Sequence, residues 1–401
     1  MTAGRRTRIL IVDDSAVMRS LLRSVIGADD SLEVAGTAAD GATALANLGR
    51  LNPDMVLLDV EMPVMDGLAT LRELRARGHK MPVIMCSSLT QRGARVTIEA
   101  LASGASDYVA KPCGQPGRET ATQALAQELI PKIQALTSPA PARQPIVFPA
   151  PARASELAAP GALPAFSGPA PLAFRAQPMC AEPRVLVIGV STGGPAALDI
   201  LLPALPAGFP LPVLIVQHMP ELFTGPFAER LNGRCRLPVR EAAEGEPAQP
   251  GTIFIARGNW HLEVLPSARG GAAAVAPAVA GRRAEPPATL HLTQGPLENH
   301  CRPAVDVLFR SAASAYESGV LAVVLTGMGS DGMAGARMVH DRGGSVLVQD
   351  QASSAVWGMP GAVANAGLAH KVLPLRAIVP EILRIVSRAS SEARELRESV
   401  I

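Results

Sequence analysis

Three side chains of the kinds that acyl-transfer enzymes use come just after apolar runs in the second half of this chain. Ser191, His218 and Asp331 follow the runs at residues 185–190, 212–217 and 320–325, respectively. Short apolar runs bounded by glycine and proline are typical of buried strands in parallel sheets, whose ligands bind beyond the carboxyl ends of the strands. A serine, a histidine and an aspartate at one such edge could act as nucleophile, base and orienting carboxylate.

The serine lies in a motif that fits two functions. Gly189-Val-Ser191-Thr-Gly193 matches the G-x-S-x-G pattern, in which flanking glycines hold a serine on a tight strand-to-helix turn open to substrate. A glycine-rich turn after a strand could equally bind a phosphate at a helix N-terminus. His218 favours a hydrolase, because its imidazole could accept the serine proton. Asp331 could hold the imidazole tautomer, or could only cap the helix after it.

The order of these residues along the chain argues against a common hydrolase family. Here the order is serine, histidine, aspartate, whereas α/β-hydrolases have the order serine, acid, histidine. A generic lipase or esterase therefore fits poorly. The turn Gly327-Met328-Gly329 could add backbone N–H groups that stabilise an oxyanion.

A different set of polar residues follows the apolar runs of the first half. Asp13 and Asp14 come after the first run, Asp59 after the third, and Ser87 and Lys111 after two later runs. Clustered carboxylates repel one another, and a hard divalent cation such as Mg²⁺ offsets that repulsion. A carboxylate nucleophile, a metal, a hydroxyl and an ammonium together make a pocket that can accept a phosphoryl group.

Alternating apolar and amphipathic segments predict the elements that position these residues. In the first half, strands are expected at 8–12, 33–36, 55–58, 82–86 and 107–110. Helices are expected at 16–27, 40–50, 66–77, 92–103 and 118–136. This alternation predicts a five-stranded parallel α/β sheet. The pattern resumes from Arg184, with further strands at 252–256, 260–265 and 345–349 and a terminal helix over 375–399.

Stretches rich in proline and alanine predict a break between the two halves. Residues 137–181 have repeated prolines and few charges, which favours an extended, flexible linker. Residues 269–287, rich in glycine, alanine and proline, predict a loop or hairpin insertion. The expected organisation is a first domain at 5–130, a linker at 137–181, a second domain at 184–372 and a helix at 375–399.

Bulk composition excludes several functional classes. The formal net charge is +2 and aromatic residues make up 3%, so neither nucleic-acid binding nor an anionic membrane surface is indicated. The five cysteines are scattered without a CxxC pair, which favours reduced thiols in the cytoplasm over a zinc site or a disulfide framework. The N-terminus lacks a signal-peptide pattern, and no apolar run reaches the roughly 18 residues of a membrane helix.

The motifs of the first half resemble those of response-regulator receiver domains. Within residues 5–130 they are Ile-Val-Asp13-Asp14-Ser, Leu-Leu-Asp59-Val-Glu-Met-Pro-Val-Met-Asp-Gly67, Cys-Ser87-Ser and Lys111-Pro112. The resemblance implies a flavodoxin-like fold with Asp59 as the phosphoacceptor. It implies an Mg²⁺ site formed by Asp13, Asp14, Asp59 and the backbone carbonyl of Glu61. It also implies that the phosphoryl group is sensed by Ser87, Tyr108 and Lys111.

The motifs of the second half resemble those of chemotaxis protein-glutamate methylesterases (the CheB family), in which a receiver precedes the esterase. They are Gly-Val-Ser191-Thr-Gly-Gly-Pro195, Gln-His218-Met-Pro220, His300-Cys-Arg-Pro-Ala-Val-Asp306 and Thr-Gly-Met328-Gly-Ser-Asp331-Gly-Met333. The resemblance implies two doubly wound parallel-sheet α/β domains, the second Rossmann-like. It implies a nucleophile, a general base and an orienting carboxylate at Ser191, His218 and Asp331. Oxyanion support would come from Thr192 and Met328, and the cleft would be lined by His300 and Arg302.

The resemblance implies hydrolysis of glutamate methyl esters on chemoreceptors with release of methanol, and deamidation of certain receptor glutamines. A chemotaxis histidine kinase would be the phosphodonor, Mg²⁺ would bind the receiver, and the esterase site would need no cofactor. The unphosphorylated receiver is expected to hinder the cleft, and phosphorylation to open it. We expect a cytoplasmic protein that neither binds nucleic acid nor inserts into a membrane.

Three alternatives stay open. A receiver-controlled protein could hold a phosphorylated ligand at residues 189–194, but that function needs neither His218 nor Asp331. A receiver-linked transcription factor is disfavoured, because the second half has no helix-turn-helix pattern and no basic recognition stretch. An esterase that serves a chemosensory-like pathway other than motility fits the same motifs.

Overall fold

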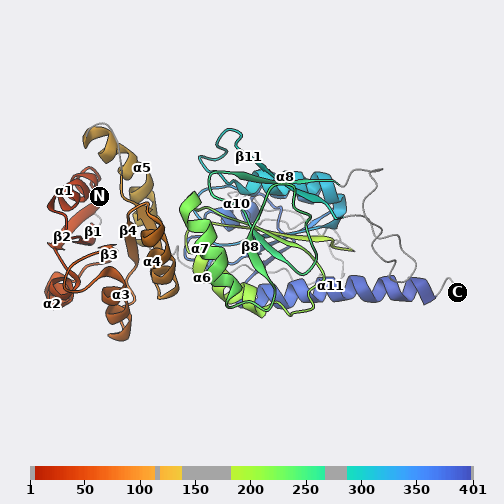
Figure 1. Cartoon of the computed structure of the whole chain (residues 1–401), viewed down its shortest axis with the longest axis horizontal. Helices are drawn as coiled ribbons and strands as arrows, with labels where there is room; N and C mark the ends of the chain where they lie inside the picture. The colour runs from red at the N-terminus through yellow and green to blue at the C-terminus, as the bar shows by residue number, and fades with distance from the viewer. Residues whose placement is uncertain (1–4, 113–117, 138–181, 267–286, 399–401) are drawn as a thin grey trace, which may run out of the picture.

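The computed structural model describes residues 5–112, 118–137, 182–266 and 287–398, which form two α/β units (Figure 1). Residues 138–181 of the predicted linker and nearly all of the predicted insertion at 269–287 lie outside the described residues. None of the described helices combines the length and the hydropathy that spanning a bilayer requires.

The N-terminal unit is built on five parallel strands: β1 (Thr7–Val12), β2 (Leu32–Ala38), β3 (Met55–Asp59), β4 (Val83–Ser87) and β5 (Asp107–Ala110). Their order in the sheet is β2-β1-β3-β4-β5. The helices between and after them are α1 (Ala16–Gly27), α2 (Gly41–Leu51), α3 (Gly67–Ala76), α4 (Gln91–Ala102) and α5 (Arg118–Thr137). The predicted strands and helices of this half are thus confirmed, with small shifts at their ends.

Helices cover both faces of this sheet. Consecutive side chains of a strand point to opposite faces, so neighbouring residues enter different clusters. Ile9 and Ile11 of β1 join a cluster with α1 and α5, whereas Leu10 and Val12 join one with α2, α3 and α4. All four are at most 1% exposed, and burial of a side chain of this size contributes about 1.5–3 kcal/mol. The strand order reverses between β1 and β3, which is where such sheets bind their ligands.

The C-terminal unit has a larger parallel sheet. Its strands are β6 (Val185–Val190), β7 (Val213–Gln217), β8 (Val239–Glu241), β9 (Ile253–Ile255), β12 (Val320–Val324), β13 (Ser345–Gln349) and β14 (Lys371–Leu373). They are ordered β14-β13-β12-β6-β7-β9-β8. The α-helices are α6 (Gly194–Leu201), α7 (Glu221–Asn232), α8 (Val305–Tyr316), α9 (Met333–Asp341), α10 (Met359–Asn365) and α11 (Leu375–Glu398). The order reverses at β6, so the carboxyl ends of β6, β7 and β12 meet at the switch point.

One predicted strand lies outside the main sheet. Residues 261–265 form β10 (His261–Leu265), which pairs antiparallel with β11 (Thr289–Thr293) in a separate two-stranded sheet. Helix α8 packs on β10, and Leu262 and Val264 are buried while Glu263 and Leu265 are more exposed. A strand covered on one face only suits an antiparallel pair, whereas parallel strands are buried on both faces.

The two units contact each other through helix α4 of the first and helices α6 and α7 of the second (Figure 1). The rings of Tyr108 and Phe223 stack across the contact with centroids 4.8 Å apart. The carboxylate of Glu229 lies 3.1 Å from the guanidinium of Arg95. Tyr108 and Phe223 are 5% and 0% exposed, so the two stacked rings are buried in this contact.

Candidate active site

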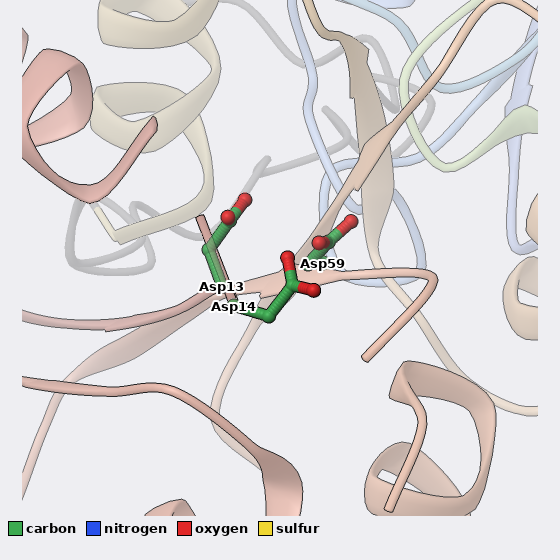
Figure 2. A group of neighbouring side chains, drawn as sticks. All are labelled: Asp13, Asp14 and Asp59. Atoms are coloured by element: carbon green, nitrogen blue, oxygen red, sulfur yellow. The ribbon is translucent and has the colours of Figure 1, made fainter. Parts of the chain in front are cut away.

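The acidic pocket of the N-terminal unit forms at the switch point of its sheet. Asp13 follows β1, Asp59 ends β3, and the carboxylates of Asp13, Asp14 and Asp59 lie within 4.8 Å of one another. Figure 2 shows the three side chains gathered at the ends of their strands. Asp13 and Asp59 are buried and Asp14 is exposed. The sequence prediction that these carboxylates meet at one edge is confirmed.

Lys111 partly neutralises this pocket. Its Nζ lies 2.9 Å from Asp13 Oδ2 and 2.7 Å from Asp59 Oδ1. Burial raises the pKa of Asp59, and the ammonium of Lys111 only partly opposes that rise. Burial alone would lower the pKa of Lys111, but its contacts with Asp13 and Asp59 outweigh burial and raise it. Two buried carboxylates that share one ammonium leave negative charge that a hard cation with oxygen ligands can balance.

The other predicted receiver residues lie in different surroundings. Ser87 is fully buried at the end of β4, and its Oγ accepts a hydrogen bond from Thr97 Oγ1 at 2.8 Å. The Tyr108 ring stacks on Phe223 of the other unit rather than facing solvent. The Glu61 side chain is exposed and its carboxylate lies 3.5 Å from the Arg92 guanidinium. Its side chain is thus outside the acidic cluster, which leaves its carbonyl as the group that could contribute there.

In the C-terminal unit, Ser191 lies in the turn between β6 and α6. Its backbone N–H donates to the Thr326 carbonyl at 3.0 Å, and its carbonyl accepts from Gly194 N at 2.8 Å. Gly193 has φ +77°, a left-handed conformation that favours glycine. A Cβ at Gly194 would lie 2.0 Å from Gln217 Oε1. Both glycines are therefore required by the tight turn that holds the serine.

Gln217, which sequence reasoning did not single out, connects the serine and histidine segments. Its Nε2 donates to the Ser191 carbonyl at 3.1 Å and to the His218 carbonyl at 3.2 Å. The residue is 2% exposed, although it ends the apolar strand β7. A polar side chain at the buried end of a strand must find hydrogen-bond partners, and this was the signal that could have revealed its role.

The side chains of His218 and Asp331 are in direct polar contact. His218 Nε2 lies 2.8 Å from Asp331 Oδ2. Burial alone would lower the pKa of His218, but the hydrogen bonds with Asp331 and Cys301 outweigh it and raise the pKa to about 9. The contact with Asp331 therefore favours the protonated imidazole, in which Nε2 donates to the carboxylate.

Asp331 is held by more than the histidine. Its two oxygens accept hydrogen bonds from the backbone N–H groups of Val305, Asp306 and Gly332 and from the Asn299 amide, at 2.7–3.0 Å. Burial would raise the pKa of Asp331, but His218 and these donors lower it. Asp331 lies before α9 but holds the start of α8 as well, so the simple cap interpretation does not describe it. Asn299 is a second residue that sequence reasoning missed.

The structure brings some predicted residues together and leaves others apart. Ser191 and the turn after β12 are adjacent, since a Cβ on Gly327 would lie 2.9 Å from Ser191 Cβ. In the described part of the chain, no hydrogen bond joins Ser191 to His218; His218 Nδ1 instead lies 3.6 Å from Cys301 Sγ. Thr192 Oγ1 donates to Asp107 Oδ2 of the other unit at 2.8 Å. The Thr192 hydroxyl is thus turned towards the N-terminal unit.

A pocket of about 370 Å³ opens beside this site. It is lined by residues of both units: Leu89, Pro220, Glu221, Leu222, Asn259, Leu297 and Arg302. The Arg302 guanidinium donates to Asn259 Oδ1 at 2.7 Å and to the Gly295 carbonyl at 2.7 Å. His300 is exposed and has φ +62°. Of the two predicted cleft residues, Arg302 lines this pocket and His300 does not.

The chain matches two protein families in separate segments. The family model described as CheB methylesterase matches residues 186–382, and the one described as response regulator receiver domain matches residues 9–123. A protein of Nocardioides sp. (strain ATCC BAA-499 / JS614), named protein-glutamate methylesterase/protein-glutamine glutaminase, is 49% identical over 95% of this chain and 96% of its own length. A protein of the same name from Trichodesmium erythraeum (strain IMS101) is 43% identical over 94% and 98%. The crystal structure of the Thermotoga maritima CheB methylesterase catalytic domain is 39% identical, with a TM-score of 0.45, and covers 51% of this chain and 100% of that domain.

Proposed function

This chain belongs to the family of receiver-containing CheB methylesterases, and we propose on that basis that Ser191, His218 and Asp331 hydrolyse glutamate methyl esters of chemoreceptors. The observation that carries this assignment is the 2.8 Å contact between His218 and Asp331 at the sheet edge where the Ser191 turn also lies. A phosphate-binding loop would need no such pair. Relatives that match nearly the whole chain bear the name protein-glutamate methylesterase/protein-glutamine glutaminase, so we extend the proposal to glutamine deamidation.

The proposed chemistry is acyl transfer through a serine. His218 in its neutral form takes the Ser191 proton as the hydroxyl oxygen attacks the ester carbonyl, and then protonates the departing methoxide to give methanol. His218 next activates water, which releases the glutamate carboxylate from Ser191. Asp331 holds the imidazole and stabilises its protonated form. Backbone N–H groups of the turn at Met328 and the Thr192 segment are proposed to stabilise the oxyanion. With glutamine as substrate, the same steps release ammonia.

In the receiver, we propose that Asp59 accepts the phosphoryl group from a chemotaxis histidine kinase. Mg²⁺ would be held by Asp13, Asp14, Asp59 and the carbonyl of Glu61, and when bound it would neutralise charge on the phosphoryl oxygens. Three carboxylates within 4.8 Å of one another, two of them in contact with the Lys111 ammonium, fit such a cation. Lys111 and Ser87 would contact the phosphoryl group. We propose that the esterase site uses no cofactor, and that the protein acts in the cytoplasm, where its kinase and the receptor signalling helices lie.

Regulation is proposed to act through the contact between the units. The predicted switch residue Tyr108 stacks on Phe223, and Asp107 holds the hydroxyl of Thr192, next to the nucleophile. A change at Asp59 that moves Tyr108 would therefore weaken the contact and shift the population towards separated units with an open cleft. An Asp59→Asn variant should keep the basal esterase rate and lose stimulation by acetyl phosphate. Stimulation equal to that of the parent would contradict this part of the proposal.

The first test is methanol release from methylated chemoreceptor membranes. The parent and Ser191→Ala are compared, each with and without acetyl phosphate and Mg²⁺. We expect release by the parent, stimulation by acetyl phosphate and loss of release in Ser191→Ala. Absence of release from the parent under every condition would reject the receptor-esterase function and favour the ligand-binding alternative.

A further inference from the structure

A thiol that the esterase mechanism does not use lies against the catalytic base. Cys301 Sγ is 3.6 Å from His218 Nδ1. The other ring nitrogen, Nε2, already contacts Asp331 Oδ2 at 2.8 Å. Nδ1 is therefore the nitrogen that remains to accept the proton of Ser191. The sulfur therefore lies beside the ring nitrogen that the proposed reaction needs.

The loop that carries Cys301 is fastened to the same carboxylate as the histidine. Asn299, two residues before the cysteine, donates from Nδ2 to Asp331 Oδ1 at 2.8 Å and to Asp306 Oδ2 at 2.9 Å. Glu298 and Cys301 exchange backbone hydrogen bonds of 3.1 and 2.9 Å. Asn299 adopts a φ of +52° within this turn. These contacts hold the backbone of Cys301 beside His218.

Cys301 is partly exposed, and the next residue, Arg302, lines the pocket of about 370 Å³ that opens beside the site. Two other described cysteines differ. Cys86 is 1% exposed inside the receiver core, and burial raises the pKa of its thiol. Cys235 is partly exposed but packs at the core cluster around α7, where burial raises its pKa to about 11.

We propose that Cys301 is a modification site, at which a low-molecular-weight disulfide or a related sulfur electrophile switches the esterase off by blocking His218. The inference rests on the proposed function of His218. In the reaction, the Cys301 sulfur bonds to one sulfur of the disulfide, the disulfide bond breaks, and the other half leaves as a thiolate that takes up the thiol proton. The His218 imidazole, with Nδ1 3.6 Å from the sulfur, is placed to assist this proton transfer. The product places a new substituent against Nδ1, and reduction by a thiol reverses the block.

The test uses the full chain and methyl methanethiosulfonate, which transfers a methylthio group to a thiolate and releases methanesulfinate. The parent, Cys301→Ser, Cys301→Ala and Cys235→Ser are treated, and each is compared with its own untreated rate of methanol release. Labelled cysteines are located by mass spectrometry of a protease digest, and dithiothreitol is then added. Labelling of Cys301 is also timed in His218→Gln, a readout that requires no esterase activity.

We expect the parent and Cys235→Ser to lose more than about 100-fold in rate, the size of a general-base contribution, and to regain it with dithiothreitol. The Cys301 variants should keep their untreated rates in the reagent. Labelling of Cys301 should be faster than that of Cys235 and should slow in His218→Gln. The inference is overturned if labelled Cys301 coexists with full activity, if the Cys301 variants are inhibited like the parent, or if Cys301 reacts no faster than Cys235. An untreated parent without activity would contradict the proposed function instead, while the labelling rates still decide on the cysteine.

Discussion

Two buried aspartates near the switch points of the two sheets have pKa values shifted in opposite directions. Asp59 in the receiver is 4% exposed and Asp331 in the esterase unit is 2% exposed. Burial and the nearby charge of Asp13 raise the pKa of Asp59. Lys111 and the Val60 N–H lower it, but by less. Burial acts on Asp331 as well, but there the hydrogen bonds from His218 and from backbone donors lower the pKa.

The two pKa shifts differ because the two carboxylates accept different numbers of hydrogen bonds. Asp331 accepts hydrogen bonds from three backbone N–H groups, an amide and an imidazole. Asp59 accepts one backbone hydrogen bond, from Val60, and contacts one ammonium. A carboxylate saturated with donors is a fixed anion that can hold a cationic imidazole. A carboxylate that remains short of partners can bind a metal or take a phosphoryl group.

The largest effect is expected from Asp331→Asn. The change removes the charge that holds the imidazolium and permits the wrong tautomer, so kcat for methanol release should fall about 10⁴-fold. Steady-state assays on methylated receptor membranes measure this. Asp59→Asn is the matched control, because it removes the other buried carboxylate without touching the esterase site. A similar basal loss in both variants would contradict the distinction between the two pockets.

The pH dependence of the esterase should follow His218. Only the neutral imidazole can take a proton, and its pKa is raised to about 9. Well below that pKa, the neutral fraction of the imidazole rises roughly tenfold per pH unit. We therefore expect kcat/KM to rise roughly tenfold between pH 7 and pH 8. Because the shift is upward from 6.5, the stability it contributes is complete below pH 6.5 and is lost as the pH rises through about 9. The rate with Ser191→Ala measures uncatalysed hydrolysis by hydroxide and is subtracted. A kcat/KM that does not change between pH 7 and pH 8 would rule out His218 as a base with a raised pKa.

Addition of Mg²⁺ should stabilise the receiver. At a concentration of about 100 times the Kd, a ligand that binds only the folded state adds ~2.7 kcal/mol to the free energy of unfolding. Thermal unfolding with Mg²⁺ or with a chelator measures this. Asp13→Asn should lose most of the gain, since it removes a buried carboxylate of the cluster. An equal gain in the parent and in this variant would place the cation elsewhere.

The smallest effect is expected at the contact between the units. Tyr108→Leu removes the stacking on Phe223 but keeps an apolar side chain. Such ring pairs are worth about 0.5–1.5 kcal/mol beyond their buried area, so the basal esterase rate should rise about 2- to 10-fold. Arg95→Ala is the control, because its ion pair with Glu229 is well exposed and such pairs contribute about 0–1 kcal/mol. If Tyr108→Leu left the basal esterase rate unchanged, the stacking of Tyr108 on Phe223 would not restrain the esterase.

Most of the fold could be predicted from the sequence, because buried parallel strands consist of continuous runs of apolar residues. The edge strands β8 and β14 escaped prediction, since each has three residues and neither is fully buried. The residues of both pockets were predicted through their place after strands. Gln217, Asn299 and Cys301 were not, because their roles depend on contacts between segments distant in sequence. Hydrogen bonds of that kind leave no periodic trace in a single chain.

The position of β5 has a consequence for solubility. It is the last strand in the order of the receiver sheet, and its residues Asp107 and Tyr108 contact the esterase unit. Uncovered edge strands can pair with other chains and start aggregation. β5 spans four residues and begins with an aspartate, two features that discourage such pairing. The proposed separation of the units would therefore expose only a short edge that begins with a charged residue, which does not favour pairing with neighbouring molecules.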